Sequence, residues 1–494
     1  MLYNHLKSGT DIRGVASDIL GKEVDLTLDA VYDITSAFVV WYCNKFSIDS
    51  SELKIAVGHD SRITGESISK EVIRALINSG VTVLDCGLAS TPAMFMTTVE
   101  LKTNAAIEIT ASHHPSDRNG LKFFLTSGGL DSKDISEIIE IANRQEEVIP
   151  DKKGEVIPTD FMKDYAASLR RMICKGIGKT EEEKPLKDYK IVVDAGNGVG
   201  GFYAKEVLEN LGAETAGSKF LNPDGMFPNH IPNPENEAAM KSICEAVENS
   251  GADLGIIFDT DVDRAGCVDS KGNPINRNRL IALAAYIASR GRNDAVIVTD
   301  SVTSEGLHDY IENHLGCTHF RYRRGYKNII NMAHKLVQEG KDCPLAIETS
   351  GHAALKENYF LDDGAYLATK IVIELAKGND IAKILEPLKM PAEELEIRIN
   401  INAEDFKAYG ENVIKEFEEM VDFNPNYIKA KDNREGIRVK TKNGCFILRL
   451  SVHDPVMPMN FESEVKGGIK EDIEEIKGFF QQFSMLDISS LNNI

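Results

Sequence analysis

Short apolar runs recur along the chain, and each is followed by a polar or glycine-containing turn and then by an amphipathic stretch. The run KIAVGHD (54–60) precedes such a stretch from about Ser67, and KIVVDAG (190–196) precedes another over residues 201–211. Two further runs, DLGIIFD and AVIVTDS, end in acidic turns. A strand, a loop, a helix and another strand in this order are typical of parallel α/β layers. The sequence therefore predicts an α/β protein.

The pattern restarts several times, which predicts more than one domain. A length of 494 residues suffices for about three or four domains of ordinary size. We expect three related mixed α/β domains over residues 1–180, 181–290 and 291–388, with the charged stretch Thr180–Lys187 as a linker. We expect a C-terminal α+β domain over residues 389–494, because EELEIRINI, EGIRVKT and CFILRLSV read as strands of an antiparallel sheet.

Composition excludes several classes of protein. A formal net charge of -21 repels nucleic acid and anionic membranes over long range, so we expect neither as a partner. The eight cysteines are scattered without a C-x-x-C pair, which argues against a cysteine-based zinc site. The longest apolar run, near Leu280–Ala288, is about half of a membrane span. The first residues, MLYNHLKSGTDIRG, lack the apolar core of a signal peptide, so we expect a cytoplasmic protein.

The segment Thr110–Pro115, TASHHP, follows the apolar run AAIEI. This order predicts that Ser112 lies on an exposed loop at the carboxyl end of a strand, where ligands bind in open α/β sheets. Two adjacent histidines, with Lys122 ten residues on, favour a functional serine, although an arbitrary loop serine more often caps a turn. The context is not G-x-S-x-G, which argues against an α/β-hydrolase.

Another apolar run, LGIIF, leads directly into Asp259, Asp261 and Asp263, followed by Arg264. Three like charges this close repel one another unless a cation lies among them, and a tight loop that turns them inward would suit Mg²⁺. A solvated acidic turn is the alternative. An EF-hand is excluded, because the sixth position is Arg264 instead of Gly and the twelfth is Ser270 instead of Glu.

An Asp-nucleophile phosphatase is a rival interpretation of the same acidic segment. Such enzymes also place Asp-x-Asp after a strand. In that case Asp259 itself would be phosphorylated and Ser112 would be incidental, but Asp263 and Arg264 would have no assigned task.

Three further motifs are weak when taken alone. Glu348, Ser350 and His352 share a glycine-containing loop after a strand and offer donors and acceptors for sugar hydroxyls. The segment 449–455, RLSVHDP, contains groups that can grip a phosphate. GNGVGG (196–201) matches the G-x-G-x-x-G of dinucleotide-binding proteins, and we interpret it as tight packing between a strand and a helix.

Basic residues needed to hold an anion lie in or near these loops, although each one alone is most simply a surface residue. They are Arg13, Arg62, Lys122, Arg264, Lys327 and Arg449.

Taken together, the motifs resemble the α-D-phosphohexomutase superfamily, which includes phosphoglucomutase and phosphomannomutase. The resemblance covers nearly the whole chain in family order. It rests on GTDIRG, VGHDSR, TASHHPSDRNGLKFF, VVDAGNGVGG, NPDGMFPNHIPNP (222–234), the triple-Asp loop with its Arg, ETSGH and RLSVHDP. It implies three related α/β domains and a C-terminal domain with an antiparallel sheet, arranged around a central cleft.

The resemblance also implies a reaction and a set of roles. Hexose 1-phosphate and hexose 6-phosphate, of glucose and/or mannose, would be interconverted through phosphorylated Ser112, with Mg²⁺ and a hexose 1,6-bisphosphate as intermediate and activator. A phosphoglucosamine mutase is the alternative within the family. Monomer and homodimer both stay open. The implied roles are Mg²⁺ binding by Ser112, Asp259, Asp261 and Asp263, and catalysis at the transferred group by Ser112, Arg13, Lys122 and Arg264. The phosphosugar would be bound by Glu348, Ser350, His352, Lys327, Arg449, Ser451 and His453, with His352 also beside the transferred group.

The chain departs from the family pattern in its last motif. Many members carry Arg-Pro-Ser-Gly-Thr-Glu-Pro there, whereas Leu450, Val452, His453 and Asp454 replace four of those positions in this sequence. The Arg that usually follows aligns with Pro458. In the serine loop, His114 stands where Asn is commoner. We therefore expect an altered phosphate grip in the last domain.

Overall fold

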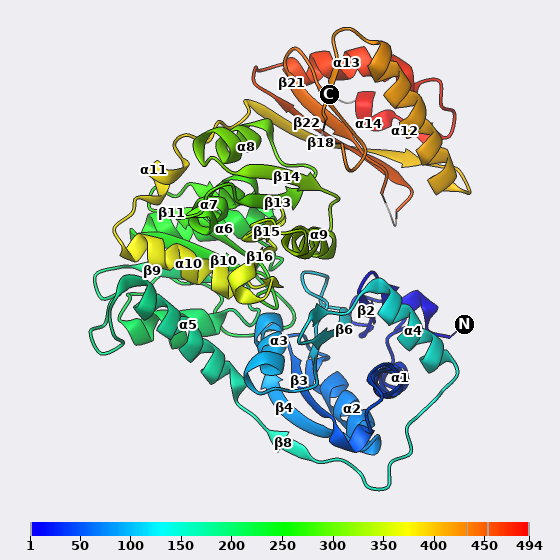
Figure 1. Ribbon diagram of the computed structural model, residues 1–494, viewed down its shortest axis with the longest axis vertical. Coiled ribbons are helices and arrows are strands. Elements are labelled where there is room, and N and C mark those ends of the chain that lie inside the picture. Colours follow the sequence, from blue (N-terminus) through cyan, green and yellow to red (C-terminus); the bar gives the residue numbers. More distant parts are fainter. Residues whose placement is uncertain (1, 432, 452–453, 493–494) are drawn as a thin grey trace. The chain divides into compact units, whose positions relative to one another are not determined.

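The computed structural model describes residues 2–431, 433–451 and 454–492, which form two compact units (Figure 1). The first unit contains the chain up to Leu280 together with Ser350–Ala382. The second contains Ile281–Thr349 and the chain from Lys383 on. None of the helices in the described ranges combines the length and the apolar character that crossing a bilayer requires.

The first unit begins with a mixed sheet in the strand order β1-β2-β6-β5-β3-β4-β8, with β7 beside β6. Strands β3, β4, β5 and β8 are parallel, whereas β1, β2, β6 and β7 pair in antiparallel fashion. The strands are β1 (Lys7–Ser8), β2 (Asp11–Val15), β3 (Lys54–His59), β4 (Thr82–Leu88), β5 (Ala105–Ile109), β6 (Arg118–Leu125), β7 (Gly128–Gly129) and β8 (Val156–Pro158). Because β5 coincides with the run AAIEI, the strand predicted before Ser112 is confirmed.

Four helices accompany this sheet, namely α1 (Leu28–Phe46), α2 (Gly65–Asn78), α3 (Thr91–Glu100) and α4 (Ser132–Asn143). The chain then continues in α5 (Phe161–Ile177). Side chains of α1, α2 and α4 join those of β3 and β5 in one apolar core, which includes the fully buried Phe38. Helix α3 packs against β5, β3 and β6 and also touches α5. Two short 3₁₀ turns, Asn4–Leu6 and Ser50–Glu52, complete this part of the unit.

A second sheet in the first unit has the order β12-β11-β10-β9. Strands β9 (Ile191–Asp194) and β10 (Leu254–Phe258) are parallel, and β11 (Ala265–Asp269) and β12 (Pro274–Ile275) continue in antiparallel fashion. Helix α6 (Glu237–Ser250) packs on β9 and β10. The segment predicted as a helix over residues 201–211 forms a π-helix (Tyr203–Leu208) and a 3₁₀ turn (Glu209–Leu211).

Residues 350–382 also belong to the first unit. They contain the hairpin of β16 (Ala353–Leu355) and β17 (Leu361–Asp362), with the 3₁₀ turn Lys356–Asn358 between its strands. Helix α10 (Gly364–Ala376) follows and packs against α5 and β11. The predicted linker Thr180–Lys187 is packed, since Leu186 is fully buried and its N–H donates to the carbonyl of Leu211.

The second unit begins with the parallel strands β13 (Val296–Asp300), β14 (Thr318–Tyr322) and β15 (Leu345–Ile347). Its helices here are α8 (Glu305–Asp309), the π-helix Tyr310–His314 and α9 (Tyr326–Gln338). The chain passes from one unit to the other at three points: within α7 (Arg277–Ser289), between Thr349 and Ser350, and within α11 (Ile381–Leu385).

The C-terminal part of the second unit is an antiparallel sheet in the order β19-β20-β21-β22-β18-β23. Its strands are β18 (Glu393–Ile401), β19 (Ile428–Lys429), β20 (Ile437–Lys440), β21 (Gly444–Leu448), β22 (Val456–Ser463) and β23 (Leu486–Asp487). Helices α12 (Phe406–Phe423), α13 (Gly468–Phe480) and α14 (Ser489–Asn492) contribute apolar side chains to the core that covers it. The antiparallel strands predicted for this region are thus confirmed.

The glycine motif 196–201 packs tightly against neighbouring backbone, as predicted. A Cβ on Gly198 would lie 2.5 Å from the carbonyl oxygen of Thr260, and one on Gly201 would lie 2.0 Å from that of Leu221. The N–H of Val199 donates to the same Thr260 carbonyl at 2.8 Å. The motif therefore supports the acidic loop after β10.

We expect Gly198→Ala to lower the free energy of unfolding by about 1–3 kcal/mol, because the added methyl overlaps the Thr260 carbonyl. Urea unfolding followed by circular dichroism measures this change. Gly478→Ala is the control, because a Cβ there meets nothing within 4 Å. In helix α13 it should instead stabilise by roughly 0.5–1 kcal/mol. Unchanged stability of the Gly198 variant would contradict the packing role.

Candidate active site

Ser112 lies in the loop after β5, at the carboxyl ends of the parallel strands β3 and β5. Its backbone is left-handed, with φ 52°, and its N–H donates to Thr110 Oγ1 at 2.8 Å. The prediction of an exposed loop is wrong for the serine itself, since Ser112 is only 3% exposed. The loop is drawn inward because a buried arginine binds its carbonyl groups.

Arg62 is that arginine. Its Nη1 donates to the carbonyls of Pro115 and Arg118 at 2.6 and 2.8 Å. Its Nη2 donates to those of Ser112 and His114 at 2.5 and 2.6 Å. The sequence suggested an anion-holding or surface residue, but Arg62 is 3% exposed and its donors bind the serine loop.

Asp60 anchors this arginine. Its Oδ2 lies 3.2 Å from Arg62 Nε and accepts a hydrogen bond from Thr110 Oγ1 at 2.7 Å. Burial raises the pKa of Asp60 even though Arg62 lies beside it. The motif VGHDSR thus supplies a buried pair that shapes the loop around Ser112.

The acidic loop connects β10 to β11. Val262, between two of the acids, adopts a left-handed φ of 66°. Asp259, Asp261 and Asp263 are 0%, 0% and 4% exposed, and one ligand atom from each lies within 4.8 Å of those of the other two. The three carboxylates therefore converge, as the sequence predicted.

Charge is unevenly distributed among these acids. Burial, followed by the charges of Asp263 and Asp261, raises the pKa of Asp259 well above its ordinary range. Burial would also raise the pKa of Asp263, but Lys122, His352 and Arg264 together hold it well below that range. Asp261 Oδ1 and Asp263 Oδ1 have no hydrogen-bond partner within the described chain. Unsatisfied carboxylate oxygens in a converging set fit a hard divalent cation such as Mg²⁺.

Ser112 meets these acids although about 150 residues separate them along the chain. Its Oγ donates to Asp259 Oδ2 at 3.4 Å. On its other side lies His113 Nδ1, at 3.2 Å. Burial, together with nearby positive charges, lowers the pKa of His113 to about 2, so this imidazole is neutral at physiological pH.

Lys122 extends from β6 into the acidic cluster. Its Nζ donates to Asp261 Oδ2 at 2.9 Å and to Asp263 Oδ2 at 2.7 Å. Arg13 lies opposite Gly120 in the β2–β6 pairing, and its Nη2 contacts Asp11 Oδ2 at 2.7 Å. A side chain at 120 would crowd both Arg13 and the carbonyl of Ile12, which explains the glycine of the NGLK segment.

Arg264 and His352 complete the cluster. Arg264 Nε donates to Asp259 Oδ2 at 3.1 Å, and its Nη1 donates to Asn233 Oδ1 at 3.2 Å. His352 forms an isolated β-bridge with Arg264. Burial lowers the pKa of His352 to about 3, and Arg264 contributes to this shift. The structure thus brings Ser112, the three acids, Lys122, Arg264 and His352 together within the first unit.

Sequence reasoning missed several residues that hold this cluster. Thr91, at the start of α3, donates from Oγ1 to Asp261 Oδ2 at 2.5 Å and from its N–H to the carbonyl of Asp261. Asn233 and His113 were seen only as parts of longer motifs. Ser90-Thr91-Pro92 does carry a helix-start signal, but that signal gives no indication of which loop the threonine would contact.

The remaining predicted residues belong to the second unit, apart from Ser350, which lies in the first. Glu348 Oε1 accepts the N–H of Gly325 at 2.5 Å, just before the helix that carries Lys327. Arg449 Nη2 donates to Asn460 Oδ1 at 3.2 Å, and its Nη1 lies 4.0 Å from Glu435 Oε2. Ser451 Oγ accepts the N–H of Asp454. His453 lies outside the described residues.

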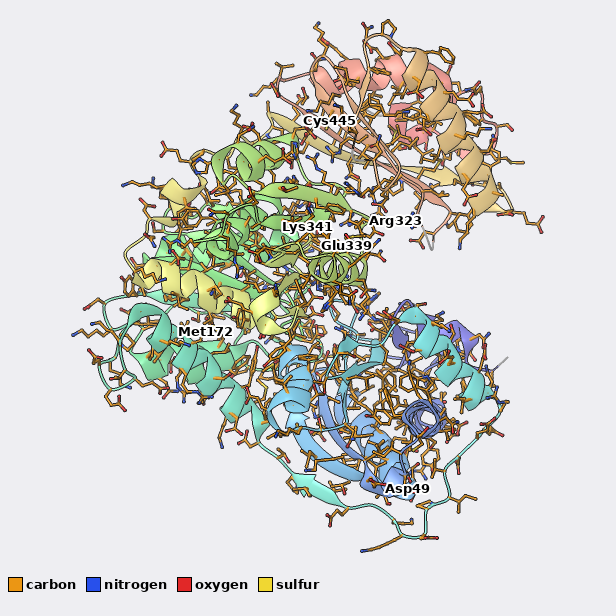
Figure 2. All side chains as sticks on the ribbon, viewed as in Figure 1. Asp49, Met172, Arg323, Glu339, Lys341 and Cys445 are labelled. Carbon is orange, nitrogen blue, oxygen red and sulfur yellow. The ribbon has the colours of Figure 1, made fainter. Side chains whose placement is uncertain are left out.

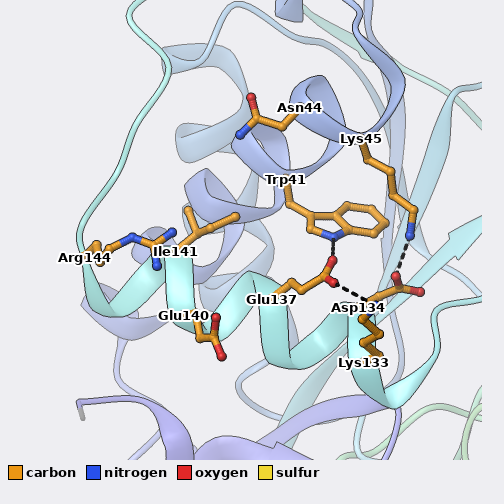
Figure 3. Close-up of a pocket in the computed structure, with 9 residues that line it drawn as sticks. All are labelled: Trp41, Asn44, Lys45, Lys133, Asp134, Glu137, Glu140, Ile141 and Arg144. Carbon is orange, nitrogen blue, oxygen red and sulfur yellow. Dashed lines mark hydrogen bonds and ion pairs between the residues drawn. The ribbon is translucent and has the colours of Figure 1, made fainter.

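Two other features do not belong to this site. A groove between α1 and α4 is lined by Trp41, Glu137 and their neighbours (Figure 3), and none of the predicted residues is among its lining side chains. Glu305, Glu462 and Cys445 (labelled in Figure 2) form a second acidic trio. Three cations, Arg321, Arg438 and Lys440, already neutralise Glu305, and burial holds the pKa of Cys445 well above its ordinary range, so this trio is a poor metal site.

Comparisons with known proteins agree with this geometry. Three models of phosphoglucomutase/phosphomannomutase α/β/α domains match the chain: domain I at residues 6–148, domain II at 163–272 and domain III at 276–390. The phosphoglucomutase of Neisseria gonorrhoeae is 29% identical, covering 93% of each chain. The phosphomannomutase/phosphoglucomutase of Pseudomonas aeruginosa PAO1 is 29% identical, covering 97% of this chain and 95% of that protein. A phosphoglucosamine mutase of Lactobacillus delbrueckii is 25% identical, covering 92% and 96%.

Solved structures share the fold. A phosphoglucomutase/phosphomannomutase family protein from Burkholderia thailandensis superposes with a TM-score of 0.78 at 24% identity, over 98% of each chain. The phosphoglucomutase parafusin from Paramecium gives a TM-score of 0.71 at 16% identity, over 97% of this chain and 95% of that one. The fold thus comprises three α/β/α domains and a C-terminal antiparallel-sheet domain, whereas the exact domain boundaries stay predictions.

We expect Arg62→Ala to destabilise the protein by about 3–5 kcal/mol, because it leaves Asp60 buried without its ion partner and frees the serine loop. Chemical unfolding measures the loss, and proteolysis within residues 111–118 reports on the loop. Arg74→Ala is the matched control. That arginine pairs with Glu71 on the surface, so its removal should cost less than about 1 kcal/mol. Equal losses of stability in the two variants would contradict the role of Arg62 in holding the serine loop.

Asp263→Asn should weaken Mg²⁺ binding by about tenfold or more, because the site loses one charged ligand. Isothermal titration of the metal-free protein with MgCl₂ measures the affinity. Glu462→Gln, in the second acidic trio, is the control and should leave the affinity unchanged. Wild-type affinity in the Asp263 variant would show that the cation binds elsewhere.

Proposed function

Because this chain belongs to the phosphoglucomutase/phosphomannomutase family, we propose that it interconverts hexose 1-phosphate and hexose 6-phosphate, of glucose and/or mannose, with Ser112 as the phosphoryl carrier. One observation carries the assignment of the carrier: Ser112 Oγ lies 3.4 Å from Asp259 Oδ2, at the edge of the converging carboxylates. This proximity matters because a phosphorylated serine needs a cation beside it to offset its charge.

Phosphoryl transfer requires positioning and charge compensation more than covalent chemistry by the protein. Phosphoserine carries about -1.5 to -2 charge, which the three acids would repel in the absence of a cation. When held by Asp259, Asp261, Asp263 and an oxygen on Ser112, Mg²⁺ would supply that compensation and draw electron density from the phosphoryl oxygens.

The chain's own cations complete the compensation. Lys122 Nζ, within 2.9 Å of two of the acids, can move toward the charge that spreads over the transferred group. Arg264 fixes Asp259, and Arg13 supplies a further guanidinium. His113 Nδ1 lies 3.2 Å from Oγ of Ser112, so the neutral imidazole can orient this hydroxyl without adding charge to the site.

The proposed cycle has two transfers. Phosphorylated Ser112 gives its phosphoryl group to the free hydroxyl of the bound hexose phosphate, which becomes a hexose 1,6-bisphosphate. This intermediate reorients, and Ser112 takes back the other phosphoryl group. A bisphosphate from outside would restore an enzyme that had lost its phosphoryl group, which makes it an activator. The residues proposed to hold the sugar and its non-reacting phosphate are Glu348, Ser350, His352, Lys327, Arg449, Ser451 and His453.

Two rivals differ in measurable ways. A phosphoglucosamine mutase would share the serine and the acids and differ only in the sugar it accepts. An Asp-nucleophile phosphatase would carry its phosphoryl group on Asp259 and release phosphate. Against that rival, both oxygens of Asp259 already accept hydrogen bonds: Oδ2 from Arg264 Nε and Ser112 Oγ, and Oδ1 from the N–H of Arg264. The cytoplasmic location expected from the sequence is part of the proposal.

Ser112→Ala should abolish turnover, because it removes the hydroxyl proposed to carry the phosphoryl group beside Asp259. A ³¹P NMR time course with glucose 1-phosphate, Mg²⁺ and a trace of glucose 1,6-bisphosphate measures it. Near-normal activity of this variant would reject the carrier, and steady release of inorganic phosphate by the wild type would favour the phosphatase.

The same measurement with mannose 1-phosphate and glucosamine 1-phosphate defines the sugar. We expect glucose and mannose 1-phosphates to be converted faster than glucosamine 1-phosphate. Faster conversion of glucosamine 1-phosphate would instead support a phosphoglucosamine mutase.

Ser50→Ala is the control for Ser112→Ala and should retain activity, because it changes a buried serine in a 3₁₀ turn that is remote in sequence from the serine loop.

A further inference from the structure

Residues 222–236, which include the motif NPDGMFPNHIPNP, contain neither helix nor strand. This segment nevertheless supplies Asn233, whose Oδ1 accepts a hydrogen bond from Arg264 Nη1 at 3.2 Å. Glu235 Oε2 lies 3.8 Å from the same nitrogen. Arg264 in turn holds Asp259. The first part of the segment is held at Asn197, whose carbonyl accepts the N–H of Asp224 at 2.9 Å and whose Oδ1 accepts Nδ2 of Asn229 at 2.7 Å.

His230 adds a buried contact three residues before Asn233. Its Nε2 lies 3.1 and 3.2 Å from the two carboxylate oxygens of Asp194, at the end of β9. Its Nδ1 lies 3.0 Å from the carbonyl oxygen of Ile231. The side chains of His230 and Asp194 are 3% and 0% exposed, so water does not substitute for either partner.

Both partners of the imidazole are acceptors. A carbonyl oxygen cannot donate, and Asp194 already accepts from the N–H of Gly196 at 2.9 Å and from Ser242 Oγ at 2.7 Å. A neutral imidazole has one N–H and would leave its other nitrogen facing an acceptor. Two donors are present only when both ring nitrogens carry a proton.

We propose that His230, held as an imidazolium between Asp194 and the Ile231 carbonyl, is a positioning residue that fixes segment 222–236 so that Asn233 holds Arg264 beside Asp259. The role of Arg264 rests on the proposed function, whereas the protonation of His230 does not. Its surroundings agree with a cation: Asp194 is the facing anion, the charge of Lys219 opposes it, and the ring of Phe220 lies 5.4 Å away.

The glycine motif makes room for this contact. A Cβ on Gly196 would lie 2.8 Å from Cβ of Pro232 and 3.2 Å from Cε1 of His230. The glycine motif GNGVGG and the motif NPDGMFPNHIPNP therefore meet at His230. Burial would lower the pKa of His230, but the hydrogen bond and charge of Asp194 raise it above 6.5.

Selective ¹⁵N labelling of the histidines tests the protonation directly. Long-range ¹H–¹⁵N spectra should show an imidazolium at pH 6.5 whose signal disappears in His230→Gln. In Asp194→Asn the same histidine should lose its second proton at lower pH. A neutral His230 imidazole at pH 6.5 in the wild type would overturn the proposal, whatever the activity of the variants.

Kinetics test the positioning role. His230→Gln should lower kcat about tenfold or more with less than about a threefold change in KM, because Arg264 acts on the transferred group. Combined with Asn233→Ala, its effect should be non-additive, since the two residues act through the same arginine. His5→Gln, at an exposed position, is the control and should leave kcat unchanged. Wild-type kcat in His230→Gln, or additive effects in the double variant, would refute this role.

The stability difference between wild type and His230→Gln gives a readout that needs no activity. A histidine whose pKa is raised by folding stabilises the folded protein when it is protonated. This stabilisation is complete below the ordinary histidine pKa, and it is lost as the pH rises through the raised pKa of the folded state. The difference should therefore be largest below pH 6.5 and shrink at higher pH. A difference that does not vary with pH would contradict the imidazolium. If no mutase activity is found at all, this measurement and the NMR spectra still decide the proposal.

Discussion

The burial of three carboxylates in one loop is the constraint on which the rest of the first unit depends. Asp259, Asp261 and Asp263 are almost completely withdrawn from water, so their mutual repulsion must be offset inside the protein. The compensating groups come from distant parts of the chain, with Lys122 on β6, Thr91 on α3 and Arg264 at the start of β11. Folding of the two sheets of this unit therefore becomes coupled to the assembly of the acidic cluster.

The loops that carry the site need support of their own, which consists of backbone contacts and of one buried side-chain contact. Arg62 donates to carbonyl groups of the serine loop, Gly198 approaches the Thr260 carbonyl, and Asn233 orients Arg264. Such contacts fix where a loop lies more rigidly than exposed side-chain pairs do, because buried polar groups are costly to leave unpaired. Left-handed backbone at Ser112 and Val262 is tolerated for the same reason.

The local sequence pattern predicted those parts of the site whose structure depends on residues close together in the sequence. The run AAIEI is β5, LGIIF is β10, and the acids that follow it converge as expected. The sequence did not predict the burial of Ser112 or the task of Arg62, because both arise from contacts across about 50 residues. The sequence did not predict the role of Asn233 either, since its partner Arg264 lies 31 residues away in another loop. The helix expected over residues 201–211 has a π and 3₁₀ form instead, where glycines bring the backbone close to its neighbours.

The division of roles between the units bears on specificity. All the groups proposed to act on the transferred phosphoryl lie in the first unit, whereas Glu348, Lys327, Arg449 and Ser451 lie in the second. The altered last motif belongs to this second group. Arg449 there has a carboxylate, Glu435, at 4.0 Å and an amide, Asn460, at 3.2 Å, so part of its charge is already compensated. A guanidinium in that setting binds a dianion less strongly than an uncompensated one. The phosphate grip proposed for the last domain therefore rests on an arginine whose charge is partly compensated within the protein.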